Sequence, residues 1–400
     1  MKTYSWILHI RYHVEPFNDE LVSRLISCST IPSNFFHSNN YTILNHTLVT
    51  LIHLLTFTYL AKRLGLTVDE VAKHLKELLQ CGLVKEEDGS YRPAFAIFTV
   101  EDQKILMPLI NELVSDTVKV VKRWLPKIRE TLNNITVVRR GLRFPDLEYI
   151  VIGALSLDYE GLDVLSEEGL IVKSKKMPGG GNYVFAGFEI GFFNLRSTWM
   201  WGHHSVFGKY WFNTHGSLPP TGPRMAFPDL AWLWYAQGVN LDTIMSKMIE
   251  IGNILEALVE KDLSFKNLQE KLDVDSLTLA TDLSLLLIIN YVKLIDRSVW
   301  RLAIPVFTAE DYGAVKNISR MLLKDIATKF KMKLHKIREV YVKTSPAKNN
   351  IPLEEAFNQI YHLVFGQALN KLITKDIINE PIEKIDKGKY SAFLIILSNK

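Results

Sequence analysis

The chain repeats part of its own sequence, and this repeat limits the folds that it can adopt. The segment YRPAFAIFTVEDQ (91–103) aligns without gaps with WRLAIPVFTAEDY (300–312), and LPKIRET (125–131) aligns with LHKIREV (334–340) at the same offset. Upstream, LTFTYLAKRLGL (55–66) aligns with LSFKNLQEKLDV (263–274) after the loss of one residue. Agreement at this many ordered positions indicates that one supersecondary unit occurs twice.

The repeat divides the chain into four predicted parts. Copy one covers 42–192 and copy two covers 242–400, with an N-terminal segment at 1–41 and an aromatic-rich connector at 193–241. A weaker match also relates 182–192 to 389–399. The duplication either enlarges one core or lets a single chain imitate a symmetric dimer, and the sequence leaves both interpretations open.

Composition restricts the class of protein. The chain has 400 residues, 48% hydrophobic residues, a net charge of +4 and two cysteines, Cys28 and Cys81. These values predict a folded protein of more than one domain and exclude a disulfide framework or a multi-cysteine zinc site. The N-terminus lacks the features of a signal peptide, and the most apolar run, 283–292, is about half the length that spans a bilayer. We therefore expect a cytoplasmic protein without a membrane partner.

Copy one contains clear helix and turn signals. Thr67 can cap a helix over 68–82, with Glu70 three residues later in a capping-box arrangement, and Gly82 can end it. The following stretch, LVKEEDGSYRPAFAIF, predicts a two-stranded hairpin that turns near Gly89. A shorter helix is expected over 57–65, just before the capped one.

Helix, short helix, turn, helix and hairpin is the order of a winged helix-turn-helix. The run LGLTVDEVAKHLKELLQCGLVKEE (64–87) resembles the ArsR-like family of bacterial and archaeal repressors. In that family a short helix ends in a Leu-Gly-Leu type turn, a Ser/Thr-capped recognition helix follows, and a Gly-Leu-Val stretch leads into the wing. The resemblance is weaker in copy two and does not extend to 170–240.

The resemblance implies a sequence-specific transcriptional regulator that binds double-stranded DNA and is not an enzyme. It implies DNA contacts from the recognition helix and the wing, by Thr67, Asp69, Glu70, Lys73, His74, Lys85, Ser90 and Arg92. Winged helices also serve as protein-interaction modules. The alternative is therefore a winged-helix scaffold that binds a protein or peptide through the aromatic connector without reading DNA.

Copy two departs from the family pattern. Its equivalent helix, DSLTLATDLSLLLIINY (275–291), carries Asp275 and Asp282 and no Lys, Arg or His. Because these carboxylates repel the negatively charged phosphates of DNA, this helix is not expected to read DNA. The chain also lacks the clustered cysteines of the metal-sensing branch, and Cys81 is expected to be a core residue. We expect no metal and no cofactor.

A long helix is predicted after each wing. Thr99 and Thr308 are candidate N-caps, and the segments 119–143 and 329–343 are strongly basic. From the first segment we expect phosphate contacts by Lys122, Arg123, Arg139 and Arg140. The alternative is that these cations only complement the helix dipole at a solvated helix end. In the ArsR-like family the helix after the wing dimerises, so here the two helices are expected to pair within the chain, and a further homodimer stays open.

The connector is too aromatic to be a solvated linker, because it holds most of the tryptophans of the chain. It is expected to form a core between the copies, or a pocket for a small-molecule effector. A metal site of three histidines and a catalytic site are the weaker alternatives. The tentative ligand-binding residues are Arg196, Trp199, His203, His204, His215 and Arg224.

These patterns together predict a mainly α fold with small β wings, an α+β protein. It would contain two tandem winged-helix units, each followed by a long helix. Further β elements are expected near 182–192 and 389–399.

Overall fold

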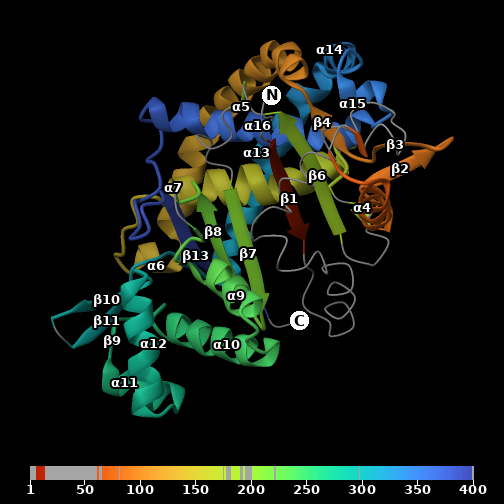
Figure 1. The fold of residues 1–400 in the computed structure, drawn as a ribbon. Helices are drawn as coiled ribbons and strands as arrows, with labels where there is room; N and C mark the ends of the chain where they lie inside the picture. Colours follow the sequence, from red (N-terminus) through yellow and green to blue (C-terminus); the bar gives the residue numbers. More distant parts are fainter. Residues whose placement is uncertain are drawn as a thin grey trace. The chain divides into compact units, whose positions relative to one another are not determined.

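The computed structural model describes residues 6–13, 61–62, 65–80, 82–173, 175–176, 182–189, 192–193, 201–219, 222–296 and 298–398. They form helices and small sheets, in agreement with the expected α+β class (Figure 1). The chain divides into two compact units of three segments each. Unit 1 comprises Met1–Leu113, Leu165–Leu195 and Ala327–His362, and unit 2 comprises Val114–Val164, Arg196–Ile326 and Leu363–Lys400.

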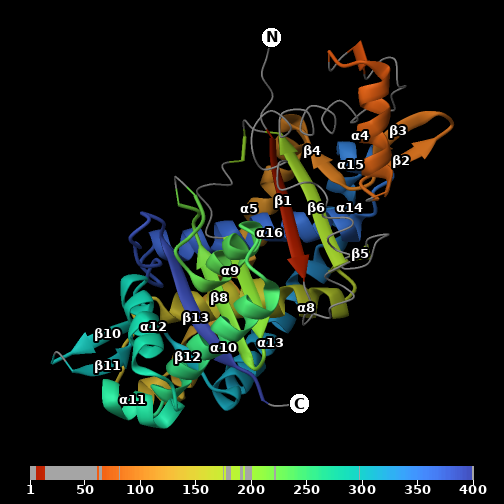
Figure 2. The same ribbon diagram turned by 60° about the horizontal axis from the view of Figure 1, so that its bottom comes forward.

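The main sheet of unit 1 is built around strand β6. It contains β1 (Trp6–His13), β4 (Ala96–Phe98), β5 (Lys175–Lys176) and β6 (Asn182–Glu189), in the order β1-β6-β4 with β5 also paired to β6. Strand β1 runs antiparallel to β6, and the two lie side by side in Figure 2, whereas β4 runs parallel to it. Phe98 lies opposite Phe188, and their buried rings stack with centroids 5.2 Å apart.

The main sheet of unit 2 follows the same pairing scheme. It contains β7 (Trp201–Phe207), β8 (Tyr210–Gly216), β12 (Val306–Phe307) and β13 (Tyr390–Ile396), in the order β12-β13-β8-β7. Strand β13 is buried along its whole length, antiparallel to β8 and parallel to β12. Phe307 lies opposite Ile395, and these are the residues that the sequence repeat aligns with Phe98 and Phe188. The β elements expected near 182–192 and 389–399 are therefore present at equivalent places in two sheets.

In unit 1, helix α4 (Val68–Gln80) precedes a hairpin of β2 (Val84–Glu87) and β3 (Ser90–Pro93). The Thr67 amide donates to the Glu70 carboxylate at 2.8 Å, and the Glu70 amide donates to the Thr67 hydroxyl at 3.3 Å. Gly82, with a φ of 68°, follows the helix, and the hairpin turns at Asp88 and Gly89, with φ of 50° and 72°. The predicted capping box, helix end and turn are confirmed. The buried stripe of α4 contains Val71, Leu75 and Leu78.

Within the described ranges, unit 2 shows more elements of the same kind. In chain order they are α10 (Leu241–Ala257), β9 (Leu263–Ser264), α11 (Phe265–Leu272), α12 (Ser276–Ile288), β10 (Val292–Ile295) and β11 (Val299–Leu302). The three strands form a sheet in the order β10-β11-β9. Asp275 caps α12 by accepting hydrogen bonds from the amides of Leu277 and Thr278, both at 3.0 Å.

Two long helices begin with matching caps. Thr99 precedes α5 (Val100–Asn134) and exchanges hydrogen bonds with Asp102, and Thr308 does the same with Asp311 at the start of α13 (Ala309–Met332). The predicted N-caps are confirmed.

No helix in the described ranges is long and apolar enough to cross a membrane. The remaining helical elements are α6 (Thr136–Arg139), α7 (Leu147–Tyr149), the π-helix η2 (Ile150–Glu160), α8 (Gly161–Glu167), α9 (Phe227–Ala236), α14 (Leu334–Tyr341), α15 (Ser345–Lys348) and α16 (Leu353–Thr374).

A glycine allows close packing between α10 and β8 in unit 2. A Cβ atom on Gly252 would overlap the ring of Tyr210, whose hydroxyl lies within hydrogen-bond distance of Asn253 Oδ1 and Glu256 Oε2, 2.6 Å from each. We expect Gly252→Ala to lower the free energy of unfolding by about 1–3 kcal/mol, because the anchored ring cannot move aside. As a control, Gly313→Ala on α13 meets no atom within 4 Å and should raise stability by about 0.5–1 kcal/mol. Urea unfolding of both variants measures the two changes in the free energy of unfolding. Equal changes would contradict the role assigned to Gly252.

Candidate functional site

The outer face of α4 is the first candidate for contact with a partner. Thr67, Asp69, Glu70 and Lys73 are exposed, whereas His74 is half-buried. Thr67 and Glu70 bind each other at the helix start, and these hydrogen bonds lower the pKa of Glu70. These two residues therefore already have a structural role in starting the helix.

The hairpin after α4 carries one exposed cation and an acidic tip. Lys85 is exposed on β2, opposite Arg92 on β3, and Ser90 is half-buried. Arg92 forms an ion pair with Glu87, and its side chain is only 13% exposed. Of the predicted wing contacts, Lys85 is therefore the cation best placed to reach a phosphate. The tip residues Glu86, Glu87 and Asp88 are exposed and carry the opposite charge.

The predicted phosphate contacts from the basic segment 119–143 lie in unit 2, and they differ in their surroundings. Lys122 and Arg139 are exposed. Arg123 is also largely exposed but donates to Asp325 at 2.6 Å. Arg140 is largely buried. It binds Asp262 and donates to the Val259 carbonyl at 2.9 Å. The four residues therefore do not form a uniform row of solvated cations.

Helix α12 of unit 2 presents an outer face without charge. Thr281 and Ser284 donate to the carbonyls of Leu277 and Ala280 in their own helix, at 2.8 and 2.7 Å. Asp282 is buried and accepts from Lys247 at 3.0 Å, and burial raises the pKa of Asp282. The exposed residues between the cap and the helix end are Ser276, Leu277, Ala280, Thr281, Ser284, Leu287 and Ile288.

The three connector histidines have three separate environments. His203 and His204 are neighbours on β7, so they point to opposite faces of the sheet. His203 Nδ1 lies 3.3 Å from Asp229, whereas His204 Nδ1 accepts from the Trp211 indole at 3.1 Å. His215 on β8 is fully buried. These histidines do not converge, and no group of metal-ligating side chains suited to an ion occurs within the described ranges.

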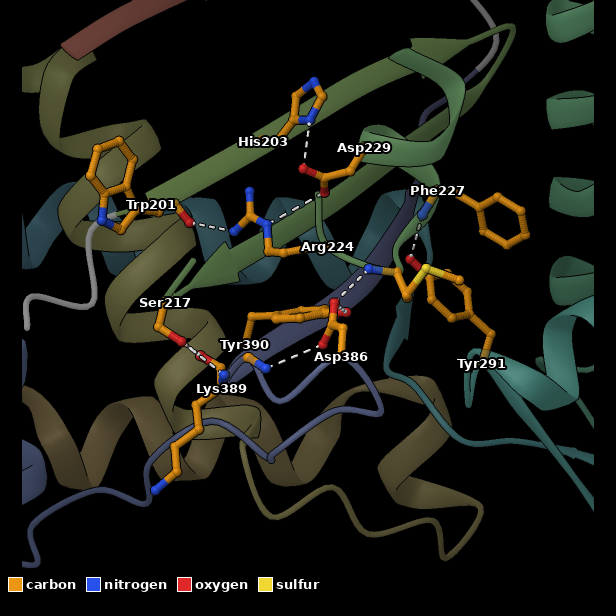
Figure 3. Close-up of polar contacts among 12 residues, drawn as sticks. Trp201, His203, Ser217, Arg224, Phe227, Asp229, Tyr291, Asp386, Lys389 and Tyr390 are labelled. Carbon is orange, nitrogen blue, oxygen red and sulfur yellow. Dashed lines mark hydrogen bonds and ion pairs between the residues drawn. The ribbon is translucent and has the colours of Figure 1, made fainter. Parts of the chain in front are cut away.

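Arg224 contacts two strands of the main sheet of unit 2 and helix α9 (Figure 3). Its buried guanidinium donates to the Trp201 carbonyl at 2.8 Å, and its Nε lies 3.4 Å from Asp229. It also lies over the ring of Tyr390 on β13, 5.7 Å from the centroid. The Tyr390 hydroxyl donates to Asp386 at 2.9 Å, and burial raises the pKa of Tyr390. These contacts give Arg224 an interior structural role. Arg196 and Trp199 lie outside the described residues.

Sequence reasoning missed a buried polar network on the π-helix η2. Asp158 lies 3.3 Å from His215 Nε2, and the Tyr149 hydroxyl is hydrogen-bonded to His215 Nδ1 at 2.7 Å. Glu160 binds Lys316 and Arg320 at 3.3 and 3.2 Å. The available signal was the placement of polar residues at every second position after an apolar run, in LSLDYE (155–160). Buried charges need such partners, so this network organises the interior of unit 2.

The comparisons with known proteins add no identification. No protein-family model matches the chain, and neither the curated proteins nor the solved structures include a significant match.

Arg139, the last residue of α6, and Arg140, which follows the helix, allow a direct test of structural and surface roles. Arg140→Ala removes a largely buried donor from two carbonyls and from Asp262, and should lower the free energy of unfolding by about 1–3 kcal/mol. Arg139→Ala, on the exposed side, should change it by less than about 0.5 kcal/mol. Thermal and urea unfolding provide the measurement. An equal effect of the two substitutions would remove the structural role assigned to Arg140.

Proposed function

We propose that the chain is a duplicated winged-helix protein that binds duplex DNA as a transcriptional regulator, through copy one. The element order supports the winged-helix assignment. In unit 2, β9 lies between two helices, and α12 is followed by the β10–β11 hairpin, whose strands pair with β9. In unit 1, α4 and the β2–β3 hairpin occupy the equivalent places in the repeat.

One observation carries the DNA proposal. Helix α4 buries one apolar stripe and leaves a polar face exposed, with Lys73 on the helix and Lys85 on the adjoining hairpin. A single α-helix fits the major groove, and exposed lysines supply phosphate contacts whose strength depends on salt. Lys76 is exposed on the same helix and adds to this charge.

Copy two supports an asymmetric mode of binding. The outer face of α12 offers no cation for phosphate and few polar side chains for base edges, because its hydroxyls bond to its own helix. We therefore propose one DNA-reading surface per chain and a DNA site without internal symmetry. An effector site near the connector and a homodimer stay predictions.

A scaffold that binds a protein partner is the second candidate. Two observations favour it: the acidic tip of the β2–β3 hairpin would repel phosphate, and α12 exposes Leu277 by 77% and Ile288 by 61%. The connector contacts described above are internal to unit 2. The exposed face of α12 is therefore a better candidate than the connector for such a partner.

Selection of purified protein from a pool of random duplex DNA, at two salt concentrations, tests the DNA proposal. We expect an asymmetric motif to be enriched, with weaker binding at higher salt. Lys73→Ala and Lys85→Ala should each reduce affinity and lower the salt dependence by about one phosphate contact.

The matched control is Lys293→Ala. Lys293 is exposed on β10 and pairs with Arg301, just as Lys85 pairs with Arg92 on the other hairpin. The Lys293→Ala substitution should leave DNA affinity unchanged if copy one alone binds DNA. Absence of any enriched motif, or equal losses for Lys85→Ala and Lys293→Ala, would rule out the proposed surface.

A further inference from the structure

Each compact unit contains residues from both copies of the repeat. Unit 1 takes its hairpin and strands β4, β5 and β6 from copy one and β1 from the N-terminal segment, but it also includes Ala327–His362 from copy two. Unit 2 takes its sheets from the connector and copy two, but it also includes Val114–Val164 from copy one. The helical segment after each wing is therefore shared reciprocally between the units.

The same capping contact occurs once in each unit. In unit 1, Asp102 accepts from the Thr99 amide at 2.8 Å and, with its other oxygen, from the Ser345 amide of copy two at 2.8 Å. Asp102 is buried, so both of its oxygens need donors. One carboxylate thus caps the start of α5 from its own copy and the start of α15 from the other copy.

In unit 2, Asp311 has the equivalent arrangement. It is buried and accepts from the Thr308 amide at 3.0 Å and from the Thr136 amide of copy one at 2.9 Å. At the offset of the ungapped alignment, Asp311 corresponds to Asp102, and Ser345 corresponds to Thr136. The contact between copies is thus made twice, with the roles of the two copies reversed.

Further contacts in unit 1 join the same two copies. Glu112 of copy one binds Lys333 at 2.8 Å and also binds Lys336, and the hydrogen bonds from these lysines lower the pKa of Glu112. The Val172 amide donates to the Glu354 carbonyl at 2.9 Å, so backbone groups contribute as well.

Unit 2 joins the copies by comparable contacts. The Trp124 indole of copy one donates to Asp325 at 2.7 Å, and Ser391 donates to the buried Asp146 at 2.6 Å. Together with Arg140, these residues connect the copy-one segment to several elements of copy two.

We infer that the two copies are binding partners of each other, held together by reciprocal exchange of the helical segments 114–164 and 327–362. The surface of each copy fits the segment of the other copy, and the covalent connection between the copies is not required for their association. This inference does not depend on DNA binding.

Cleavage of the full-length protein tests the inference. A protease recognition sequence is inserted within 194–200, the folded protein is cut, and the molar mass is measured by size-exclusion chromatography with light scattering. We expect a single species with the mass of the uncut chain, which separates into two fragments only in denaturant. Two species, each with the mass of one fragment in native buffer, would overturn the inference.

Matched variants identify the contacts that hold the cut protein together. Asp102→Asn combined with Asp311→Asn removes one acceptor at each shared cap, and should lower the urea concentration at which the fragments separate. The control, Glu101→Gln combined with Glu310→Gln, changes exposed charges in the same helical turns and should not shift it. Circular dichroism of the uncut variants verifies folding. If the fragments of both double variants separate at the same urea concentration, the role of the shared caps is overturned.

Discussion

Two buried carboxylates, Asp102 and Asp311, hold the starts of helices from different parts of the chain. A helix start leaves amide donors without partners, and a buried carboxylate is costly unless its oxygens accept hydrogen bonds. Each carboxylate meets both requirements at once, because one oxygen serves its own long helix and the other serves a short helix of the opposite copy. Strands β4 and β12 end just before these caps, so the same contacts also fix the chain where it leaves each main sheet.

Local contacts decide which cations are available for function. Arg92 and Lys85 lie opposite each other on one hairpin, but only Arg92 has an ion pair that holds it against Glu87. Arg139 and Arg140 are adjacent at the end of α6, yet Arg139 faces solvent and Arg140 binds Asp262 and backbone carbonyls. The proposed DNA surface consequently depends on a few exposed lysines, whereas Arg92 and Arg140 are held by contacts within the fold.

Local features of the fold were predictable from the sequence, because their causes lie within a few residues. The capping box at Thr67, the helix end near Gly82 and the turn at Gly89 depend on neighbouring side chains and backbone angles. The exchange of segments was not predicted, because contacts such as Asp102 to Ser345 join positions 243 residues apart. Strand β1, in the segment treated as an N-terminal extension, was missed for the same reason, since it pairs with β6.

For the candidate site, the residue types could be proposed from the sequence, but the exposure of each side chain could not. The resemblance selected Lys73, Lys85 and Arg92 together, and only the structure separates exposed from paired side chains. The connector histidines suggested a shared site because they are close in sequence. However, strand alternation turns His203 and His204 to opposite faces, and His215 is enclosed between Tyr149 and Asp158.

Hydrogen exchange of the backbone amides, with and without a selected DNA duplex, tests whether copy one alone contacts DNA. If copy one reads DNA, the duplex should slow exchange in α4 and in the β2–β3 hairpin and leave α12 and the β10–β11 hairpin unchanged. Protection of α12, or unchanged exchange throughout α4 while the duplex is bound, would contradict the account.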